Sequence, residues 1–225
     1  MSDDEAALLA AIGTHPDEDT PRLVYADWLD EHGRPERAEF IRLQCLPDGD
    51  EAQLMREAEL EERNRGRWLT DLRVPQFAEA QWAFRRGFPE ALTAPIEPFL
   101  DRYKRLAALL WVRSLCLRVS ENHPVADFLE RDWNPGWVEL ELWAERHLGL
   151  ARVVDSVAHS PRLRQLRVLR FTRFDFSPWV VDLLNASPHL DGLHLLGVPG
   201  DQNAPLFAPL RHRLGARLVG AADAR

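Results

Sequence analysis

Apolar residues recur three and four positions apart through the first 72 residues, which is the spacing of an amphipathic helix. Helix-start and helix-stop residues divide this stretch, since Pro21 follows Thr20 and a glycine, Gly13 or Gly33, follows each of the first two apolar segments. The last segment is highly charged, with the alternating Glu and Arg residues typical of a solvated helix face. We therefore predict four helices, over residues 3–13, 20–33, 35–45 and 51–72.

From residue 112 onward, short strings with apolar residues at offsets one, four and six alternate with helical segments. The strings are VRSLCL (112–117), WVELEL (137–142), LRQLRV (163–168) and LDGLHL (190–195). Their fourth positions are leucines separated by 25, 26 and 27 residues, within the about 20 to 29 residues typical of leucine-rich repeats. The helical segments between the strings cover residues 126–132, 150–163 and 177–190. This alternation predicts strands and helices in turn.

The leucine register extends in both directions. A strand-like segment at 87–94, followed by a helix-like segment at 95–110, adds one leucine before the first string, and another lies 25 residues after the last. The register leucines are Leu92, Leu115, Leu140, Leu166, Leu193 and Leu218. We predict an α/β fold, a leucine-rich-repeat solenoid of about five or six strand-helix units with an all-α N-terminal unit. The predicted division is a helical domain (1–46), a charged helical connector (47–86) and the solenoid with its C-terminal cap (87–225).

The strings TPRLVYADWLDEHG (20–33) and RAEFIRLQ (37–44) carry a family resemblance. The first 46 positions resemble the bacterial repeat-companion domain, a short module at the N-termini of paralogous proteins that carry repeats. The tract from about residue 87 resembles the leucine-rich repeats with long helical returns that often follow that module. The resemblance implies no particular activity. The chain departs from the usual repeat pattern where asparagine is expected, because the corresponding residues are Ser120, Glu145, Phe171 and Val198.

Charge is divided unevenly along the chain. Residues 1–62 hold 18 acidic residues and 5 arginines, net −13, whereas residues 63–225 hold 18 acidic and 23 basic residues, net +5. Because the first part repels phosphate backbones and the second is diluted by its own acids, we predict no nucleic-acid partner. The two cysteines lie far apart, which predicts neither a disulfide framework nor a thiolate metal site. Without an export signal or a run of roughly 20 apolar residues, we expect a cytoplasmic protein with no membrane contact.

A solenoid of this kind exposes the residues between its register leucines on the concave face of the sheet, because strand side chains alternate. The predicted partner-binding residues on this face are Arg118, Glu139, Glu141, Trp143, Arg167, Leu169 and His194. Trp143, flanked across the strands by Arg118 and Leu169, is the predicted anchor, since Trp and Arg are enriched at interface hot spots. The alternative is that this face is merely solvated or is covered by the N-terminal helices.

The sequence carries no recognisable catalytic motif. It lacks HExxH, GxGxxG, GxxxxGK[ST] and GxSxG, so we predict no enzyme activity, no metal and no cofactor. Tyr25 and Trp28, beside several acidic residues, suggest a polar cluster, but their helical spacing favours anchors in a helix core. Cys116 with His123 or His147 is the nucleophile and base pair that the sequence leaves open.

Three classes of function follow from these patterns. The favoured hypothesis is a regulatory, non-enzymatic module that binds a protein partner through the concave face, as a solenoid that holds or inhibits an enzyme would. The first alternative is a regulatory substrate that a protease cleaves or displaces in a bacterial signalling or defence system, with the Arg-rich segment RNRGRW (63–68) as the cleavage site. The second is an unrecognised enzyme, which needs a deep pocket with convergent polar groups. The identity of the partner and the oligomeric state are left open.

Overall fold

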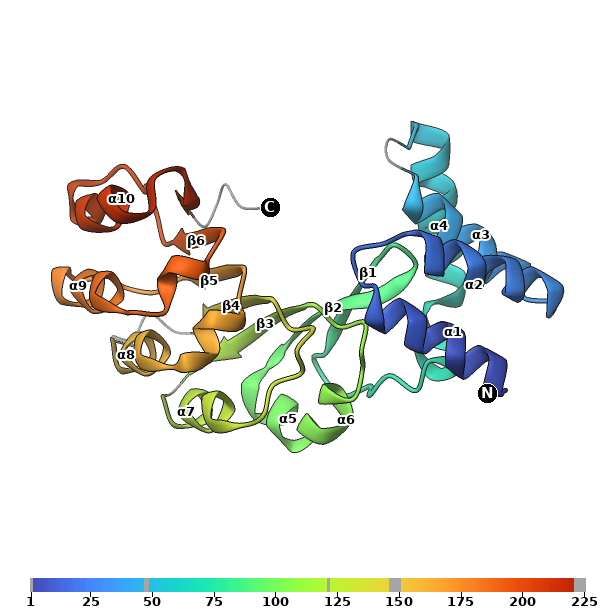
Figure 1. The fold of residues 1–225 in the computed structure, drawn as a ribbon, viewed down its shortest axis with the longest axis horizontal. Helices are drawn as coiled ribbons and strands as arrows, with labels where there is room; N and C mark the ends of the chain where they lie inside the picture. Colours follow the sequence, from blue (N-terminus) through green and yellow to red (C-terminus); the bar gives the residue numbers. More distant parts are fainter. Residues whose placement is uncertain (1, 47–48, 121, 146–150, 221–225) are drawn as a thin grey trace. The chain divides into compact units, whose positions relative to one another are not determined.

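The computed structural model describes residues 2–46, 49–120, 122–145 and 151–220. They form an α/β protein whose seven strands lie in one open, mostly parallel sheet, in the order of the sequence (Figure 1). The strands are β1 (Gln81–Arg85), β2 (Phe88–Pro95), β3 (Ser114–Val119), β4 (Glu139–Ala144), β5 (Val168–Thr172), β6 (Leu195–Val198) and β7 (Leu218–Gly220). The α-helices are α1 (Asp3–Thr14), α2 (Thr20–Glu31), α3 (Pro35–Cys45), α4 (Glu51–Asp71), α5 (Ile96–Asp101), α6 (Tyr103–Ala107), α7 (Asn122–Glu130), α8 (Ala151–His159), α9 (Pro178–Ala186) and α10 (Ala208–Leu214).

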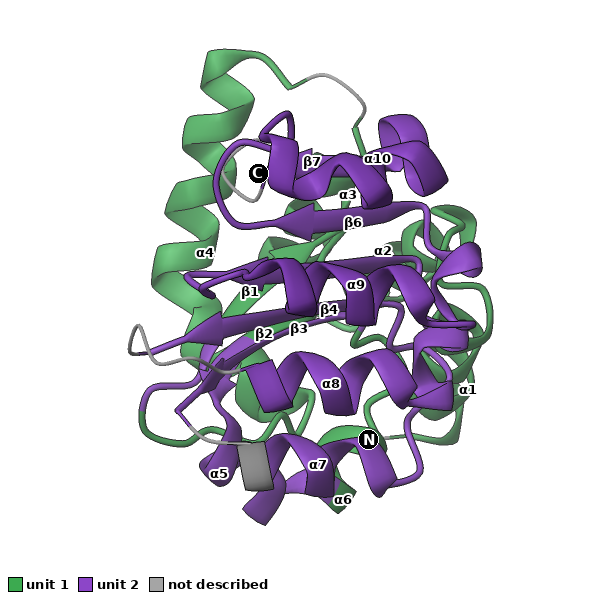
Figure 2. Cartoon of the chain, turned by 90° about the vertical axis from the view of Figure 1, so that its left-hand side faces the viewer, with its two compact units in different colours: residues 1–78, 82–92, 104–112 green, residues 79–81, 93–103, 113–225 purple. Residues whose placement is uncertain are grey.

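The chain folds into two compact units (Figure 2). Unit 1 comprises residues 1–78, 82–92 and 104–112, and unit 2 comprises residues 79–81, 93–103 and 113–225. Most of the segment predicted as a connector belongs to unit 1, because α4 packs against α3. The two units therefore do not follow the three predicted segments.

Unit 1 contains the four N-terminal helices where the sequence predicts them. The side chain of Ser2 caps α1 by accepting a hydrogen bond from the Glu5 amide, and Asp50 and Gln53 form a reciprocal capping box at the start of α4. Prolines stand in the first turns of α2 and α3, where a missing amide proton costs no helical hydrogen bond. The predicted helices are confirmed, each to within about two residues of its expected ends.

A β-hairpin completes the core of unit 1. Strand β1, which the sequence pattern did not predict, turns into β2 through Arg86 and Gly87, and both turn residues have positive φ. The turn packs directly on α3, because a Cβ atom on Gly87 would lie 2.4 Å from Cγ1 of Ile41 and 2.9 Å from its Cα. The rings of Phe40 and Trp68, with centroids 4.7 Å apart, are buried beside it.

Unit 1 also buries an ion pair. The Arg22 guanidinium donates to Glu90 Oε1 at 2.5 Å, and the two side chains are 0% and 3% exposed. A second bond runs from Arg22 Nη1 to the Glu18 carbonyl at 2.8 Å. Helix α2 is thereby joined to strand β2 by a charged contact inside the core, where an unpaired charge would be unfavourable.

Unit 2 alternates strands and helices, as the sequence predicts. Strands β3 to β7 pair in parallel, and helices α7 to α10, each between two successive strands in the chain, lie along the same face of the sheet (Figures 1 and 2). One row of leucines pairs across all five strands and is at most 4% exposed. The row consists of Leu115, Leu140, Leu169, Leu196 and Leu218. It forms the core between sheet and helices.

The register of that row differs from the predicted one at two strands. Leu140 pairs with Leu169, and the predicted partners Leu166 and Leu193 are instead buried just before β5 and β6. The cause is the repeated Ser-Pro phrase, which folds into 3-10 turns at Pro161–Gln165 and Leu190–Gly192 and delays each strand. The strands predicted over 163–168 and 190–195 are therefore placed about five residues too early. The helix predicted over 95–110 is likewise divided into α5 and α6.

Candidate functional site

The sheet of unit 2 carries polar side chains on the face opposite helices α7 to α10. Alternation along β3 and β4 turns the leucines toward the helices and Arg118, Glu139, Glu141 and Trp143 toward the other face, where all four are half-buried. Arg118 pairs in register with Trp143. The structure thus brings together four of the predicted partner-binding residues.

The other three predicted residues lie outside β3 and β4, and one of them is buried. Leu169 belongs to the leucine row and is 0% exposed, so its prediction as an exposed contact residue is wrong. Arg167 and His194 are exposed but precede β5 and β6, where the His194 amide donates to the Arg167 carbonyl at 2.7 Å. These differences follow from the 3-10 turns, which shift the strands toward the C-terminus. Thr172, not Leu169, is the partner of Trp143 across β4 and β5.

Strands β5 and β6 contribute residues to this face that the sequence reading missed. We call the whole set the polar face: Ser114, Cys116, Arg118, Glu139, Glu141, Trp143, Val168, Arg170, Thr172 and Leu195. Thr172 Oγ1 donates to Glu141 at 2.6 Å. Arg170 lies across Gly197, because its Cγ is 2.9 Å from the position of a Cβ atom on that glycine. The alternation of apolar and polar residues in VLRFT (168–172) indicates a strand at this position, whereas the leucine spacing predicts the strand about five residues earlier.

The electrostatics of the polar face do not favour nucleophilic catalysis. Burial raises the pKa of the Cys116 thiol to about 12, and the nearby Glu141 carboxylate acts in the same direction. A thiol in this state is protonated at neutral pH and is a poor nucleophile. His147 and the side chain of His123, the bases that the sequence left open for it, lie outside the described residues.

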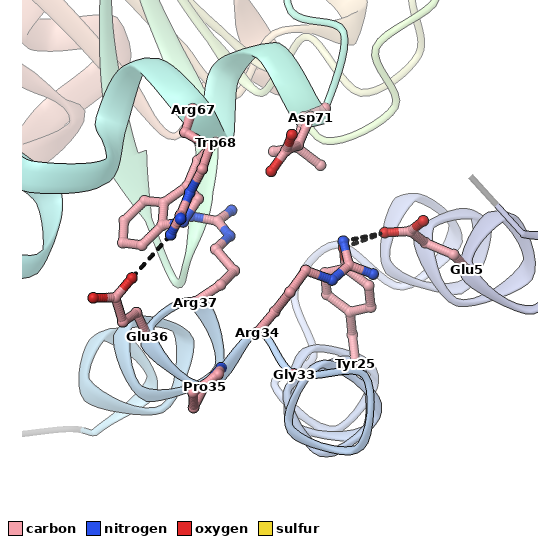
Figure 3. Close-up of a pocket in the computed structure, with 11 residues that line it drawn as sticks. Glu5, Tyr25, Gly33, Arg34, Pro35, Glu36, Arg37, Arg67, Trp68 and Asp71 are labelled. Carbon is pink, nitrogen blue, oxygen red and sulfur yellow. Dashed lines mark hydrogen bonds and ion pairs between the residues drawn. The ribbon is translucent and has the colours of Figure 1, made fainter.

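Unit 1 contains a pocket of about 360 Å³ beside the junction of α2 and α3 (Figure 3). Its lining comes from α1, α2, α3 and α4 and includes Glu5, Tyr25, Gly33, Arg34, Pro35, Glu36, Arg37, Arg67, Trp68, Asp71 and Leu72. Arg34 pairs with Glu5 at 2.8 Å, and Arg67 pairs with Glu36 at 2.9 Å. The Tyr25 hydroxyl donates to Glu5 at 3.1 Å, and burial, followed by the Glu5 charge, raises the pKa of this phenol.

Arg37 is the buried cation of this pocket. It is 5% exposed, its Nη2 donates to the Gly87 carbonyl, and its guanidinium carbon lies 4.6 Å from the Trp68 ring centroid. Within the described part of the chain, its Nη1 has no hydrogen-bond partner. Burial lowers the pKa of Arg37 to about 9, which leaves the group charged at neutral pH. A buried, charged donor without an acceptor is unfavourable and indicates a place for one.

No family model, curated protein or solved structure matches the chain. In the described ranges, no three His, Cys, Asp or Glu side chains gather as a metal site requires. None of the described helices is both long and apolar enough to cross a membrane. Function is therefore inferred from the polar face of unit 2 and the pocket of unit 1.

Proposed function

We propose that unit 2 is a leucine-rich-repeat solenoid that binds a protein partner through its polar face and catalyses no reaction. One-sided packing supports this most directly. Among the described residues of unit 2, every α-helix that follows β3 lies on the side of the leucine row (Figures 1 and 2). Parallel sheets are usually covered by helices on both faces, so a face that bears arginine, carboxylate and tryptophan side chains is a candidate for intermolecular contact.

Trp143 is the expected anchor of that contact. It is half-buried between Arg118 and Thr172 in the register of the sheet, and Trp and Arg are the residue types most enriched at hot spots. Neighbouring charges are already arranged, because Arg118 pairs with Glu79 at 2.5 Å and Glu141 accepts from Thr172. A preordered surface loses less entropy on binding.

The partner we propose is a folded protein with an apolar cleft for the Trp143 indole and a carboxylate near Arg170. Within the described chain, Nε of Arg170 is buried without a hydrogen-bond acceptor. A carboxylate from the partner would form a charge-assisted bond with the guanidinium of this half-buried side chain. An enzyme held or inhibited by the solenoid is one partner of this kind.

A matched pair of tryptophan variants tests the proposal. Trp143 lies on the polar face, whereas Trp179 lies at the start of α9 and is 54% exposed. Affinity capture from native lysate with the intact chain should lose its partner in Trp143→Ala and keep it in Trp179→Ala. For a purified partner, we expect Trp143→Ala to weaken binding on the order of 30-fold, the effect of a typical hot spot. Equal retention or equal loss in both variants, with unchanged circular dichroism, would overturn the proposal.

The protease-substrate alternative is not favoured by the structure around RNRGRW. This segment lies inside helix α4, where Trp68 is 2% exposed and the Asn64 side chain donates to the Leu60 carbonyl at 2.9 Å. Proteases cut exposed, flexible segments, so the helix would have to unwind before cleavage. We retain the resemblance of residues 1–46 to the repeat-companion domain as part of the proposal, supported by three helices in that segment.

A further inference from the structure

We propose that the pocket of unit 1 binds a small organic carboxylate that also carries an ammonium group, the chemistry of an amino acid with an apolar side chain. This site lies within unit 1 and does not depend on the function proposed for the polar face. The pocket has four features that such a ligand would match: its charges, its donors without hydrogen-bond acceptors among the described residues, its apolar walls and its size.

The charges of the lining leave one cation and one anion to face a ligand. Two arginines are neutralised by Glu5 and Glu36 in the ion pairs described above. The remaining charged groups are Arg37 and Asp71, and Figure 3 shows both pointing into the space between α4 and the junction of α2 and α3. A ligand with a carboxylate and an ammonium group complements this pair, because each charge would meet its opposite.

Two buried hydrogen-bond donors in the lining lack acceptors among the described residues. Nη1 of Arg37 and Nε1 of Trp68 are both inaccessible to solvent, and neither meets an acceptor in the described part of the structure. A guanidinium presents its donors in a planar fork, which matches the two oxygens of a carboxylate. Phosphate is disfavoured, because a dianion would meet one cation without an ion pair among the described residues, Arg37, and would be repelled by the Asp71 carboxylate in the same lining.

The walls and volume suit a ligand of amino-acid size. The rings of Tyr25 and Trp68 and the side chains of Pro35 and Leu72 provide apolar surface. A volume of about 360 Å³ is near the lower end for small-molecule sites, which span roughly 300 to 1,000 Å³. Since Arg34 and the Tyr25 hydroxyl are held by Glu5, they keep the wall in place and do not compete for the carboxylate.

Four probes separate the chemical contributions in the full-length chain. L-phenylalanine carries both charges, phenylacetate only the carboxylate, L-phenylalanine amide only the ammonium, and inorganic phosphate tests for a general anion site. Proton–nitrogen correlation NMR reports on the Trp68 indole, whose signal is assigned with Trp68→Phe. We expect saturable shifts of this signal with L-phenylalanine, weaker binding of phenylacetate, and no saturation with the amide or with phosphate.

Two variants and a matched control assign the roles of the charges. Arg37→Lys keeps the charge but loses the planar fork, and we expect it to weaken L-phenylalanine binding about 10- to 100-fold, the effect of losing a charge-assisted hydrogen bond. Asp71→Asn, on an exposed helix end, should weaken L-phenylalanine but not phenylacetate. Asp182→Asn, at an exposed position of α9 in unit 2, should change the binding of neither ligand.

Three results would overturn the proposal: equal affinity for L-phenylalanine and its amide, unchanged binding in folded Arg37→Lys, or no shift of the Trp68 indole with either carboxylate at millimolar concentration. A thermal-unfolding scan of each variant shows that it is folded. Failure here is distinguishable from failure of the proposed function, because the tryptophan variants that test the polar face are in unit 2.

Discussion

The two units differ in whether they bury charged side chains. Among the described residues, the buried charged side chains are all in unit 1: Arg22, Arg37 and Glu90. The buried polar residues of unit 2 are the uncharged Asn134, Ser160 and Ser187. The serines support the joints between helix and strand, where Ser187 Oγ donates to the Ala158 carbonyl at 2.5 Å. In unit 2, short polar side chains therefore stabilise the connections between helices and strands, whereas unit 1 has charged side chains in its core.

This difference indicates where each unit is sensitive to substitution. Short hydroxyl groups bond locally and cost little to bury, but a charge in a core needs its partner, and losing that partner is strongly destabilising. We expect unit 1 to respond most to changes of charge and close packing, and unit 2 to respond more to changes of its apolar row. Pairs of substitutions of the same chemical type, at a buried and an exposed position or in the two units, test this difference.

The largest effect is expected from Glu90→Gln, which keeps the shape of the side chain but removes the charge facing Arg22. Because the pair is buried, we expect a loss of about 3–5 kcal/mol in the free energy of unfolding. Urea titration followed by far-ultraviolet circular dichroism measures it. The control is Glu59→Gln, whose pair with Arg56 is solvent-exposed and should leave the unfolding midpoint nearly unchanged. A similar midpoint shift in both variants would show that burial of the ion pair does not decide how much its loss destabilises the protein.

The next largest effect is expected from Gly87→Ala in unit 1. The added Cβ would meet the backbone of Ile41 at 2.9 Å, and the φ of +81° is unfavourable for alanine, so we expect a loss of about 2–4 kcal/mol. Gly197→Ala in unit 2 meets Cγ of Arg170 at 2.9 Å but the Arg170 backbone only at 3.5 Å, and its φ is not positive, so it should cost well under half as much. Thermal unfolding of both variants decides the order. Equal losses would show that the rigidity of the neighbour does not set the cost.

A smaller difference is expected between the two cysteines, one in each unit. Burial raises the pKa of Cys45 to about 11 and that of Cys116 to about 12. Only the thiolate reacts, so at pH 8 the native protein should alkylate Cys45 faster than Cys116, and both rates should rise with pH. Since both folded-state pKa values are raised, their contribution to stability is complete below about pH 9 and decreases above it. Iodoacetamide labelling with mass spectrometry measures the rates, and faster labelling of Cys116 would contradict this ordering.

The smallest effects are expected at helix caps. Asp50→Ala removes the capping box of α4 in unit 1 and should cost about 1 kcal/mol. Ser177→Ala removes a longer cap bond, 3.4 Å to the Val180 amide, from α9 in unit 2, and we expect a smaller loss. Urea titration resolves both. A greater loss of unfolding free energy in Ser177→Ala would indicate that unit 2 depends more on helix capping than unit 1 does.

The candidate sites show how far sequence reading extends. Arg118, Glu141 and Trp143 were predicted on one face because alternation along a strand is a local pattern. Leu169 was misplaced because its exposure depends on where β5 begins, and that position is set by the 3-10 turn at Pro161–Gln165. The pocket around Arg37 was not predicted, since its lining comes from four helices.

The N-terminal helices of unit 1 and the alternation of strands and helices in unit 2 follow from local sequence patterns, because caps, prolines and apolar periodicity act over a few residues. The register of the leucine row and the partner of each buried charge depend instead on how the elements pack in three dimensions. Arg22 meets Glu90 across 68 positions, and Arg37 meets the Gly87 carbonyl across 50. Such contacts depend on how whole elements pack, because burial, and not spacing along the chain, decides which charges must find a partner.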